Sequence, residues 1–245
     1  MSTKPRSFWS QGYAQYAALH SESRLRYLHP FLRDLAKSFR PRKVLDFGSG
    51  DGVLFEPSVS RLQELCLFDP SHSAIRLARK RFQTSSNVSF STRASELARE
   101  HYDFAVCSLV LMAIPSLKGL RLAIRRLRQS VVPGGRCLVA VTHPCFRQYA
   151  FSSFVTEWVY GATFRYMNDG AKVRVRLTSG NENEAIEFDD YHWSLQTILT
   201  LFCEAGFTLR LVRELEDRVD EDGFANSSVP AYLVLLFQAA NSAHL

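Results

Sequence analysis

The most constraining feature of this sequence is an apolar run that passes directly into a glycine-rich turn. Residues 43–47 (KVLDF) have the composition of a buried strand, and glycines follow at positions 48, 50 and 52. Glycine lets backbone N–H groups approach a ligand without an intervening Cβ. A strand that enters such a turn and then a helix is typical of parallel α/β sheets, which bind ligands at this position.

Short apolar runs alternate with helical patterns through most of the chain, which favours a parallel α/β sheet. Ser71 has the residue type and position of a helix N-cap, and Gly206 ends a helical stripe that begins near Leu195. Six further strands are predicted after 43–47, at residues 65–68, 88–91, 102–108, 136–142, 208–213 and 231–237. The pattern therefore predicts a sheet of seven strands.

Residues 146–190 break this rhythm because they contain no strong helical pattern. Asn-Asp-Gly at 168–170 is a hairpin signal between alternating segments, and Ser-Gly-Asn at 179–181 is a second turn. The predicted strands of this region are residues 163–167, 172–177 and 185–188. We expect an inserted antiparallel β-cap after the fifth strand.

Composition excludes several classes of protein. The 245 residues are 46% hydrophobic and 22% charged, as in an ordinary globular domain with an insertion. No apolar run approaches the ~18 residues of a membrane span, and the N-terminus lacks the apolar core of a secretory signal. The 5 cysteines share no metal-type spacing, so we expect a reduced, cytoplasmic protein without a metal site.

The charges around the glycine turn indicate what it binds. Asp46 and Asp51 flank the turn, and Val53 stands where a dinucleotide-binding turn has its third glycine. Two carboxylates repel a pyrophosphate but suit a ligand with an ammonium and a sulfonium group, such as S-adenosylmethionine. Asp69, at the end of the second predicted strand, is placed to accept hydrogen bonds from ribose hydroxyls.

These segments resemble motifs of the class I S-adenosylmethionine-dependent methyltransferases. Residues 44–52, 67–71, 102–112 and 127–141 match the family's motifs in order. The resemblance implies an α/β fold with a doubly wound, mostly parallel, Rossmann-like sheet of seven strands. It also implies three parts: a lid and helix at 1–39, a cofactor-binding core at 40–145 and 191–245, and a cap over the active site at 146–190.

The resemblance implies S-adenosyl-L-methionine as cofactor, and its expected contacts are Tyr16, Asp46, Phe47, Gly48, Gly50, Asp69, Pro70, Arg93, Ala94 and Ser108. Two positions depart from the family pattern. Arg93 replaces an Asp that many members place near the adenine, so we expect backbone recognition or stacking by Arg93. Met112 replaces a histidine that is frequent in relatives.

Two histidines are the candidate catalytic and substrate-binding groups. His143 directly follows the fifth strand, and Pro144 turns the chain out of the sheet. His192 follows Tyr191, a pair similar to one in small-molecule members with a β-cap, and Tyr191 is a third catalytic candidate. Each histidine has a structural alternative: His143 hydrogen-bonds the backbone and only shapes the pocket, and His192 caps the next helix or lies in its first turn.

Aromatic residues, 12% of the chain, are the second pointer to the substrate. In the N-terminal segment, Trp9 and Tyr13 are the expected substrate contacts, next to Phe8 and Tyr16. Such rings clamp a planar substrate by stacking. The aromatic residues of the cap are expected to form its own small core: Phe151, Phe154, Trp158, Tyr160, Phe164 and Tyr166.

We therefore expect N- or O-methylation of a small planar metabolite, N-heterocyclic or aromatic, in specialised-metabolite biosynthesis, by a monomer or homodimer. The net charge of +6 leaves two alternatives, an RNA (tRNA) methyltransferase and a non-catalytic cofactor-binding relative. The basic residues concentrate on two predicted helices: Arg76, Arg79, Lys80, Arg81, Lys118, Arg121, Arg125, Arg126 and Arg128. We interpret these as solvated helix faces, which favours a small molecule over nucleic acid.

Overall fold

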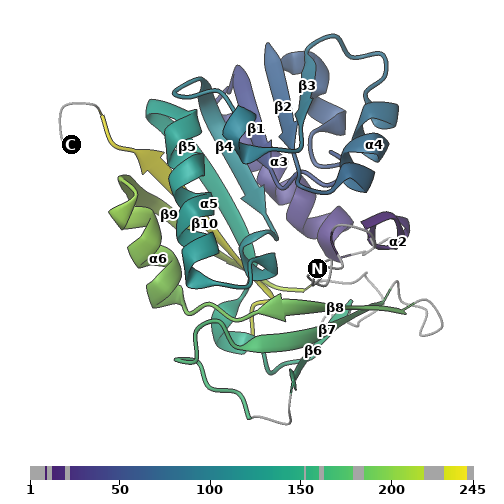
Figure 1. The fold of residues 1–245 in the computed structure, drawn as a ribbon, viewed down its shortest axis with the longest axis vertical. Helices are drawn as coiled ribbons and strands as arrows, with labels where there is room; N and C mark the ends of the chain where they lie inside the picture. Colours follow the sequence, from purple (N-terminus) through teal and green to yellow (C-terminus); the bar gives the residue numbers. More distant parts are fainter. Residues whose placement is uncertain are drawn as a thin grey trace, which may run out of the picture.

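A seven-stranded sheet forms the centre of the molecule (Figure 1). The structure is a computed structural model that describes Trp9 and residues 13–19, 23–151, 153–159, 163–178, 185–217 and 229–241. The strands are β1 (Lys43–Phe47), β2 (Glu64–Phe68), β3 (Val88–Ser91), β4 (Tyr102–Ser108), β5 (Val131–Thr142), β9 (Phe207–Leu215) and β10 (Tyr232–Ala239). Their order is β3-β2-β1-β4-β5-β10-β9, with β10 antiparallel to both neighbours. This confirms the predicted doubly wound, mostly parallel sheet.

Helices cover both faces of this sheet. They are α2 (Tyr13–Ala18), α3 (His29–Ser38), α4 (His72–Arg81), α5 (Leu117–Ser130) and α6 (Leu195–Glu204), and a π-helical turn, Ser23–Leu28, leads into α3. Short 3-10 helices occur at Glu56–Arg61, Ala94–Glu96, Leu111–Ala113 and Pro144–Phe146. Within the described ranges, no helix has the length and apolarity needed to cross a membrane.

Successive side chains of each strand point to opposite faces of the sheet, so a hydrophobic core forms on each face. Leu45 and Phe47 of β1 belong to the core under α5 and α6, which face the viewer in Figure 1. Val44 belongs to the opposite core, with Leu32 of α3 and Ala78 of α4. Burial on both faces explains why the parallel strands read as continuous apolar runs.

Capping and turn residues in the sequence predicted most ends of helices and strands correctly. The Ser71 hydroxyl accepts a hydrogen bond from the N–H of Ala74 (3.3 Å) at the start of α4, and Gly206 has a φ of +89° after α6. The fifth strand begins earlier than predicted, at Val131. Val131 pairs with Tyr102 while Arg136 pairs with Phe104, so the Pro-Gly-Gly segment between them forms a bulge inside the strand.

A second, antiparallel sheet lies below the first in Figure 1, in the order β6-β7-β8. We call it the cap sheet; its strands are β6 (Phe154–Trp158), β7 (Lys172–Thr178) and β8 (Ala185–Tyr191). The predicted inserted antiparallel sheet is thus confirmed, but the predicted strand at 163–167 is wrong. Those residues lie in the connection between β6 and β7, and the first strand is Phe154–Trp158 instead.

The turn at 168–170 does not close a two-residue hairpin, because the residues before it, 163–167, form no strand. The carboxylate of Asp169 accepts hydrogen bonds from the backbone N–H of Ser194 (2.5 Å) and the hydroxyl of Thr197 at the start of α6. Helix N-termini leave N–H groups that such a carboxylate satisfies. The turn therefore attaches the cap sheet to α6. The predicted turn at 179–181 lies outside the described residues, as do Phe8 and Tyr160.

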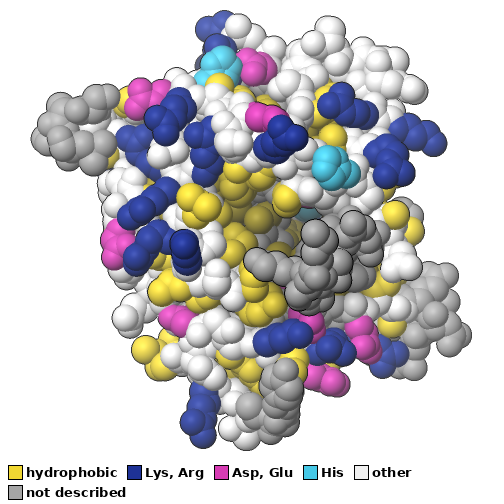
Figure 2. All heavy atoms as spheres, viewed as in Figure 1, with side chains coloured by type: hydrophobic (Ala, Val, Ile, Leu, Met, Phe, Trp, Pro, Cys, Tyr) yellow, Lys and Arg dark blue, Asp and Glu magenta, His cyan; other side chains and the backbone are white. Residues whose placement is uncertain are grey.

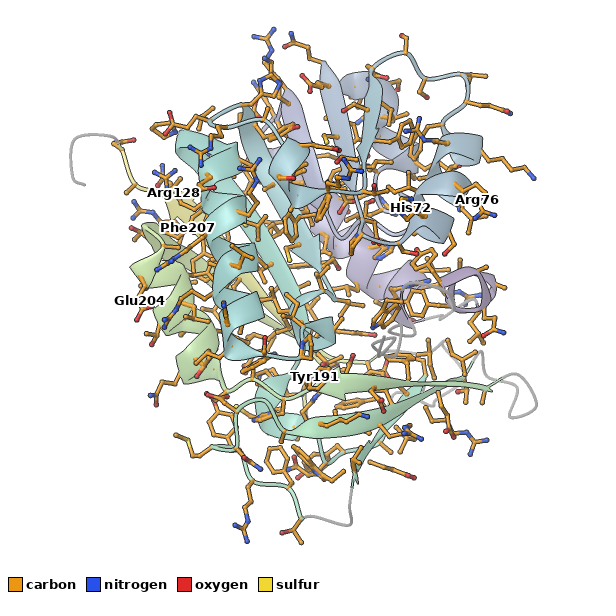
Figure 3. The ribbon with its side chains drawn as sticks, in the orientation of Figure 1. His72, Arg76, Arg128, Tyr191, Glu204 and Phe207 are labelled. Atoms are coloured by element: carbon orange, nitrogen blue, oxygen red, sulfur yellow. The ribbon has the colours of Figure 1, made fainter. Side chains whose placement is uncertain are left out.

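Not all the basic residues of the helices are solvated, which corrects the sequence interpretation. Arg128 of α5 is buried and donates to the carbonyls of Gly206 (3.3 Å) and Ala240 (3.0 Å); it lies near Phe207 in Figure 3. Arg126 donates to the carbonyls of Ala94 and Leu97. The guanidinium groups of these two arginines donate hydrogen bonds to backbone carbonyls that need a donor.

Candidate functional site

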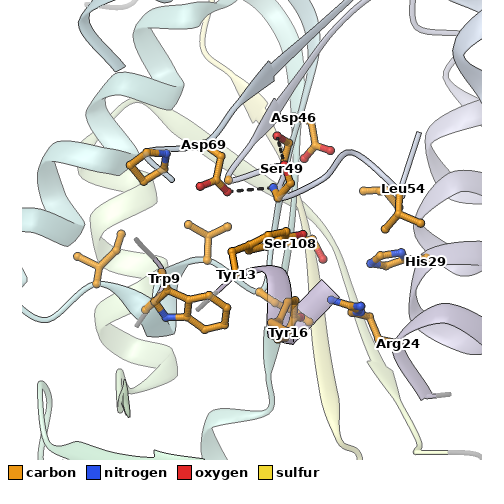
Figure 4. A pocket seen from close by; sticks show the side chains of 18 residues that line it. Trp9, Tyr13, Tyr16, Arg24, His29, Asp46, Ser49, Leu54, Asp69 and Ser108 are labelled. Carbon is orange, nitrogen blue, oxygen red and sulfur yellow. Dashed lines mark hydrogen bonds between the residues drawn. The ribbon is translucent and has the colours of Figure 1, made fainter. Parts of the chain in front are cut away.

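A cavity of about 220 Å³ lies beside the glycine turn after β1. Figure 2 shows a hollow floored by hydrophobic side chains near the middle of the molecule's face, and Figure 4 shows the lining of the cavity. The predicted residues that line it are Trp9, Tyr13, Tyr16, Asp46, Gly48, Gly50, Asp69, Pro70 and Ser108. The N-terminal segment, the glycine turn and the end of β4 thus surround one space.

Asp69 is rigidly held at the end of β2. Its Oδ2 accepts a hydrogen bond from the N–H of Gly50 (2.9 Å), and its Oδ1 accepts one from the N–H of Ser71 (2.8 Å). Burial raises the pKa of the Asp69 carboxyl, while these two backbone donors act to lower it. Each oxygen has a second lone pair, so the carboxylate can also accept from a ligand in the cavity.

Asp46, just before the turn, differs from Asp69 in its hydrogen bonding and in its pKa. Its side chain is 2% exposed, and among the described residues its Oδ2 has no hydrogen-bond partner. Burial raises the pKa of Asp46 to about 8, with further contributions from Asp69 and Asp51. A buried carboxyl at the wall of a cavity, with one oxygen unpaired by any described residue, fits a ligand that brings a cationic group.

Asp51 is already neutralised within the protein. Its Oδ2 lies 2.6 Å from the Nη2 of Arg81, and its Oδ1 accepts from the hydroxyl of Tyr13 (3.0 Å). The Tyr13 hydroxyl in turn accepts from the N–H of Asp51 (2.8 Å). Asp51 is thus engaged by Arg81 and Tyr13 and is not among the residues that line the cavity, so its expected contribution to binding a cationic ligand stays a prediction.

Gly50 is required by the close approach of the N-terminal segment. It has a φ of +59°, and a Cβ there would lie 1.9 Å from the Tyr13 hydroxyl oxygen. A side chain at this position would displace Tyr13 from Asp51. The backbone N–H groups of residues 48–52 all donate within the protein, among them that of Gly50 to Asp69 and that of Asp51 to Tyr13. The glycine turn therefore orients Asp69 and seats Tyr13, whereas the sequence predicted that its N–H groups would approach a ligand.

Arg24 and His29 line the same cavity, and sequence reasoning missed both. Arg24 is buried, its guanidinium lies 4.5 Å from the Tyr16 ring centroid, and its Nε has no partner among the described residues. Burial, together with Arg24 and Arg33, lowers the pKa of His29 well below its usual value. His29 is therefore neutral, and Arg24 is available to an anionic group. No sequence signal separates Arg24 from its basic neighbours.

Leu109 marks the boundary of a second cavity. It follows β4, has a φ of +57°, and donates its N–H to the carbonyl of Ala140 (2.8 Å). A branched residue in the left-handed region is strained, and such strain is found at functional sites. Leu109 lines both cavities, as do Trp9, Tyr16 and Arg24. The two spaces therefore share a wall made of these side chains.

The second cavity, of about 50 Å³, lies between the cap sheet and the ends of the central strands. Its wall is mostly apolar, with Asp190 and Thr142 as polar groups beside the shared Arg24. Trp9 of the N-terminal segment contacts Phe188 of β8, with ring centroids 4.8 Å apart. The remaining lining residues are Met112, Phe154, Val175, Leu177 and Tyr232.

The two candidate histidines line neither of these cavities. The Nε2 of His143 lies 2.9 Å from the Oε1 of Glu214, and its Nδ1 accepts from the N–H of Cys145 (3.3 Å). The Nε2 of His192 lies 2.7 Å from the carbonyl oxygen of Tyr166. Burial lowers the pKa of both imidazoles. Their catalytic role stays a prediction. His143 accepts a backbone N–H, as its structural alternative has it, but His192 does not cap α6, whose N-cap is Ser194.

Four other predicted residues also lie outside the lining of the first cavity. Phe47 packs in the core under α5, and the side chain of Arg93 is 76% exposed and ion-paired with Glu96. Ala94 packs against the same core. Tyr191 borders a small recess beside His192 and Arg147, separate from the first two cavities. Stacking of Arg93 on an adenine thus stays a prediction without a contact that supports it.

Comparison with known proteins identifies the family. The sequence matches the methyltransferase-domain family over residues 19–226. The chain belongs to this family. The match covers the glycine turn, Asp69 and the cap sheet, and together with the relatives below it identifies an S-adenosylmethionine-dependent methyltransferase domain of class I.

Among curated proteins, the domain is 26% identical over 157 residues to the ubiquinone biosynthesis O-methyltransferase of Bordetella avium, covering 62% of this chain and 63% of that enzyme. The chain thus spans somewhat less than two thirds of this relative. Its fold is similar to an S-adenosylmethionine-dependent methyltransferase from Clostridium acetobutylicum (12% identity, TM-score 0.65, 94% of this chain and 100% of that one). It is also similar to the N-methyltransferase NodS from Bradyrhizobium japonicum in complex with S-adenosylhomocysteine (17% identity, TM-score 0.62, 94% and 97%).

S-adenosylmethionine, the cofactor of this methyltransferase domain, fits the residues present. Asp69 retains acceptor capacity for hydroxyl groups, Asp46 provides a buried carboxyl whose Oδ2 no described residue binds, and Arg24 provides a buried guanidinium. The cofactor carries a ribose diol, two cationic centres and a carboxylate. These three side chains are chemically complementary to the three kinds of ligand group.

Proposed function

We propose that the protein transfers a methyl group from S-adenosylmethionine to a nitrogen or oxygen of a small, planar, aromatic or N-heterocyclic metabolite. The observation that carries this proposal is the pair of adjoining cavities. One has the polar groups that the cofactor needs, and the other has a mostly aromatic and aliphatic wall. Apolar pockets with a few placed polar groups are typical of small-molecule sites.

In this proposal, Asp69 binds the ribose hydroxyls, Asp46 faces the cationic end of the cofactor, and Arg24 binds its carboxylate. The cofactor supplies an activated methyl group, so the protein mainly aligns the acceptor and excludes water. Trp9 and Tyr16 stand in the wall between the two cavities and contact each other at 5.1 Å between centroids. They are placed to orient an acceptor ring toward the cofactor cavity.

Two relatives support both chemistries of the acceptor atom. The Bordetella avium relative is named as an O-methyltransferase and the Bradyrhizobium japonicum structure as an N-methyltransferase. The cover provided by the cap sheet and the N-terminal segment favours a small acceptor over an RNA strand. A role in specialised-metabolite biosynthesis, a cytoplasmic location and a monomeric or homodimeric state belong to the same proposal.

The test is the affinity for S-adenosylhomocysteine, measured by calorimetry. Asp69→Ala removes a carboxylate that accepts from ribose hydroxyls, and hydrogen bonds to charged groups contribute about 1.5–3 kcal/mol. We therefore expect affinity to fall roughly ten- to hundredfold. Asp34→Ala is the matched control, because Asp34 is an exposed aspartate of α3 that pairs only with Lys37 among the described residues. Unchanged affinity in Asp69→Ala, or no binding by the unmodified protein, would refute the proposal.

A further inference from the structure

The second cavity contains one buried carboxylate that the cofactor does not explain. Asp190 of β8 is 4% exposed and lines this cavity. On the inner face of the cap sheet it follows Phe188, and its register partner on β7 is Val173, a fully buried residue. Of the described residues around this cavity, Asp190 alone carries a carboxylate.

The two oxygens of Asp190 are in different situations. Oδ2 lies 3.4 Å from the Nη2 of Arg147, which is itself 3% exposed and also donates to the hydroxyl of Thr142. Oδ1 is buried and has no hydrogen-bond partner within the described part of the chain. Arg147 thus holds the carboxylate from one side and leaves one oxygen unsatisfied. A buried acceptor without a donor is unfavourable by about 1–3 kcal/mol, so a ligand that supplies the donor is favoured there.

We infer that Oδ1 of Asp190 accepts a hydrogen bond from the N–H or O–H group of the methyl acceptor, so that the second cavity selects an apolar ring that carries such a donor. This inference rests on the proposed methyl transfer. It names Asp190 as the residue that binds the methyl-accepting group of the substrate. It also distinguishes such substrates from apolar molecules that have no hydrogen-bond donor.

The same contact provides a destination for the proton. As the acceptor nitrogen or oxygen forms a bond to the methyl carbon, the bond from that carbon to sulfur breaks and its electron pair stays on sulfur. The N–H or O–H proton moves to Oδ1 of Asp190, so atoms and charge balance. Burial raises the pKa of Asp190 against the opposing effect of Arg147, which makes its carboxylate a stronger base than an exposed one.

Two isomeric probes isolate the donor: 3-methylindole, which has an N–H, and 1-methylindole, which has the same size and apolarity but none. Affinities are measured by calorimetry with S-adenosylhomocysteine present. A hydrogen bond to a charged acceptor is among the stronger ones, so we expect the protein to bind 3-methylindole about tenfold more tightly than 1-methylindole. In Asp190→Asn the ratio should fall to about threefold or less, because the acceptor is neutral.

A second variant protects the test against misfolding. Removing Asp190 alone by an apolar residue would leave Arg147 buried and unpaired, whereas replacing both members of a buried pair is often tolerated. In Arg147→Met/Asp190→Leu the ratio should be about one. Asp189→Asn is the matched control. The carboxylate of Asp189 is next to Asp190 in sequence but is paired with Lys172 (2.6 Å) and Arg174 (3.0 Å), so the affinity ratio should stay near tenfold in this variant.

A ratio near one in the unmodified protein, no binding of 3-methylindole, or a tenfold ratio that persists in the double variant would each overturn the inference. Asp190 would then serve only to hold Arg147. S-adenosylhomocysteine titrations of the same variants separate this failure from that of the methyltransferase proposal. Normal S-adenosylhomocysteine affinity with equal probe affinities would refute the role of Asp190 alone.

Discussion

Three aspartates near the glycine turn show how burial and partners set the state of one residue type. Asp69 is held by two backbone N–H groups, Asp51 is ion-paired with Arg81, and Asp46 is buried with no partner for its Oδ2 among the described residues. For Asp46 and Asp69, burial raises the pKa of the carboxyl, and only at Asp69 do backbone donors oppose it.

Asp46→Asn should remove a pH dependence of stability. The folded-state pKa of Asp46 is raised to about 8, so between its unfolded pKa and that value the folded protein binds more protons than the unfolded chain. Stability is then lost as pH rises through this window. Asn is neutral throughout, so the variant should gain roughly 2–4 kcal/mol over the unmodified protein between pH 5 and pH 8.

Urea unfolding at pH 5 and pH 8 measures this difference. The exposed Asp34→Asn variant provides the control, and its stability relative to the unmodified protein should not rise over this range. If Asp46→Asn and the unmodified protein lose stability in parallel from pH 5 to pH 8, Asp46 is ionised in the folded state.

At the scale of elements, buried arginines connect segments that are distant in sequence. Arg128 of α5 donates to the carbonyls of Gly206, before β9, and Ala240, after β10. It also donates to Val131 at the start of β5 (3.4 Å). One guanidinium therefore supplies donors to the ends of three strands, which a planar fork of five N–H groups can do.

Arg128→Met should destabilise the fold by about 2–4 kcal/mol, because it leaves buried carbonyls without donors while keeping most of the side-chain volume. The measurement is the free energy of unfolding in urea. Arg125→Met on the exposed side of the same helix should change it by less than about 0.5 kcal/mol. Equal stabilities of the two variants would show that the carbonyls find other donors.

At the scale of the whole molecule, three parts meet at the carboxyl ends of the central strands. The N-terminal segment contributes Trp9 and Tyr16, β4 leads into Leu109, and the cap sheet contributes Phe188. Trp9 contacts both Tyr16 and Phe188. Replacing a side chain that lines both cavities should change ligand binding in both, whereas replacing one that lines a single cavity should change binding only there.

Trp9→Ala should therefore weaken binding of both S-adenosylhomocysteine and 3-methylindole by about tenfold each, since a large aromatic contact is lost from both sites. Calorimetry with each ligand separates the two effects. Val155→Ala, on the outer face of the cap sheet and 38% exposed, should change neither affinity. Loss of only one affinity in Trp9→Ala would mean that the indole ring serves a single cavity.

Features with a local cause could be predicted from the sequence. The bounds of β1, β3 and β4 agree with their apolar runs, the cap of α4 follows from the hydroxyl of Ser71, and Asp69 lies where the glycine turn needs an acceptor. Each depends on residues near in sequence or on a motif of fixed spacing. The doubly wound, mostly parallel arrangement followed from the resemblance to a known family, whereas the strand order comes from the structure.

Other features depend on contacts between segments that are far apart in the chain. The sequence does not show that Arg24 reaches the cavity, that Arg81 neutralises Asp51, or that the candidate histidines are engaged elsewhere. It also misplaced the first strand of the cap sheet. Arg147, forty-three residues away, binds Oδ2 of Asp190, while Oδ1 has no partner in the part of the chain that the structure describes. Hydrogen bonding and desolvation at such sites are set by tertiary packing, so only the structure decides which polar groups are free to bind a ligand.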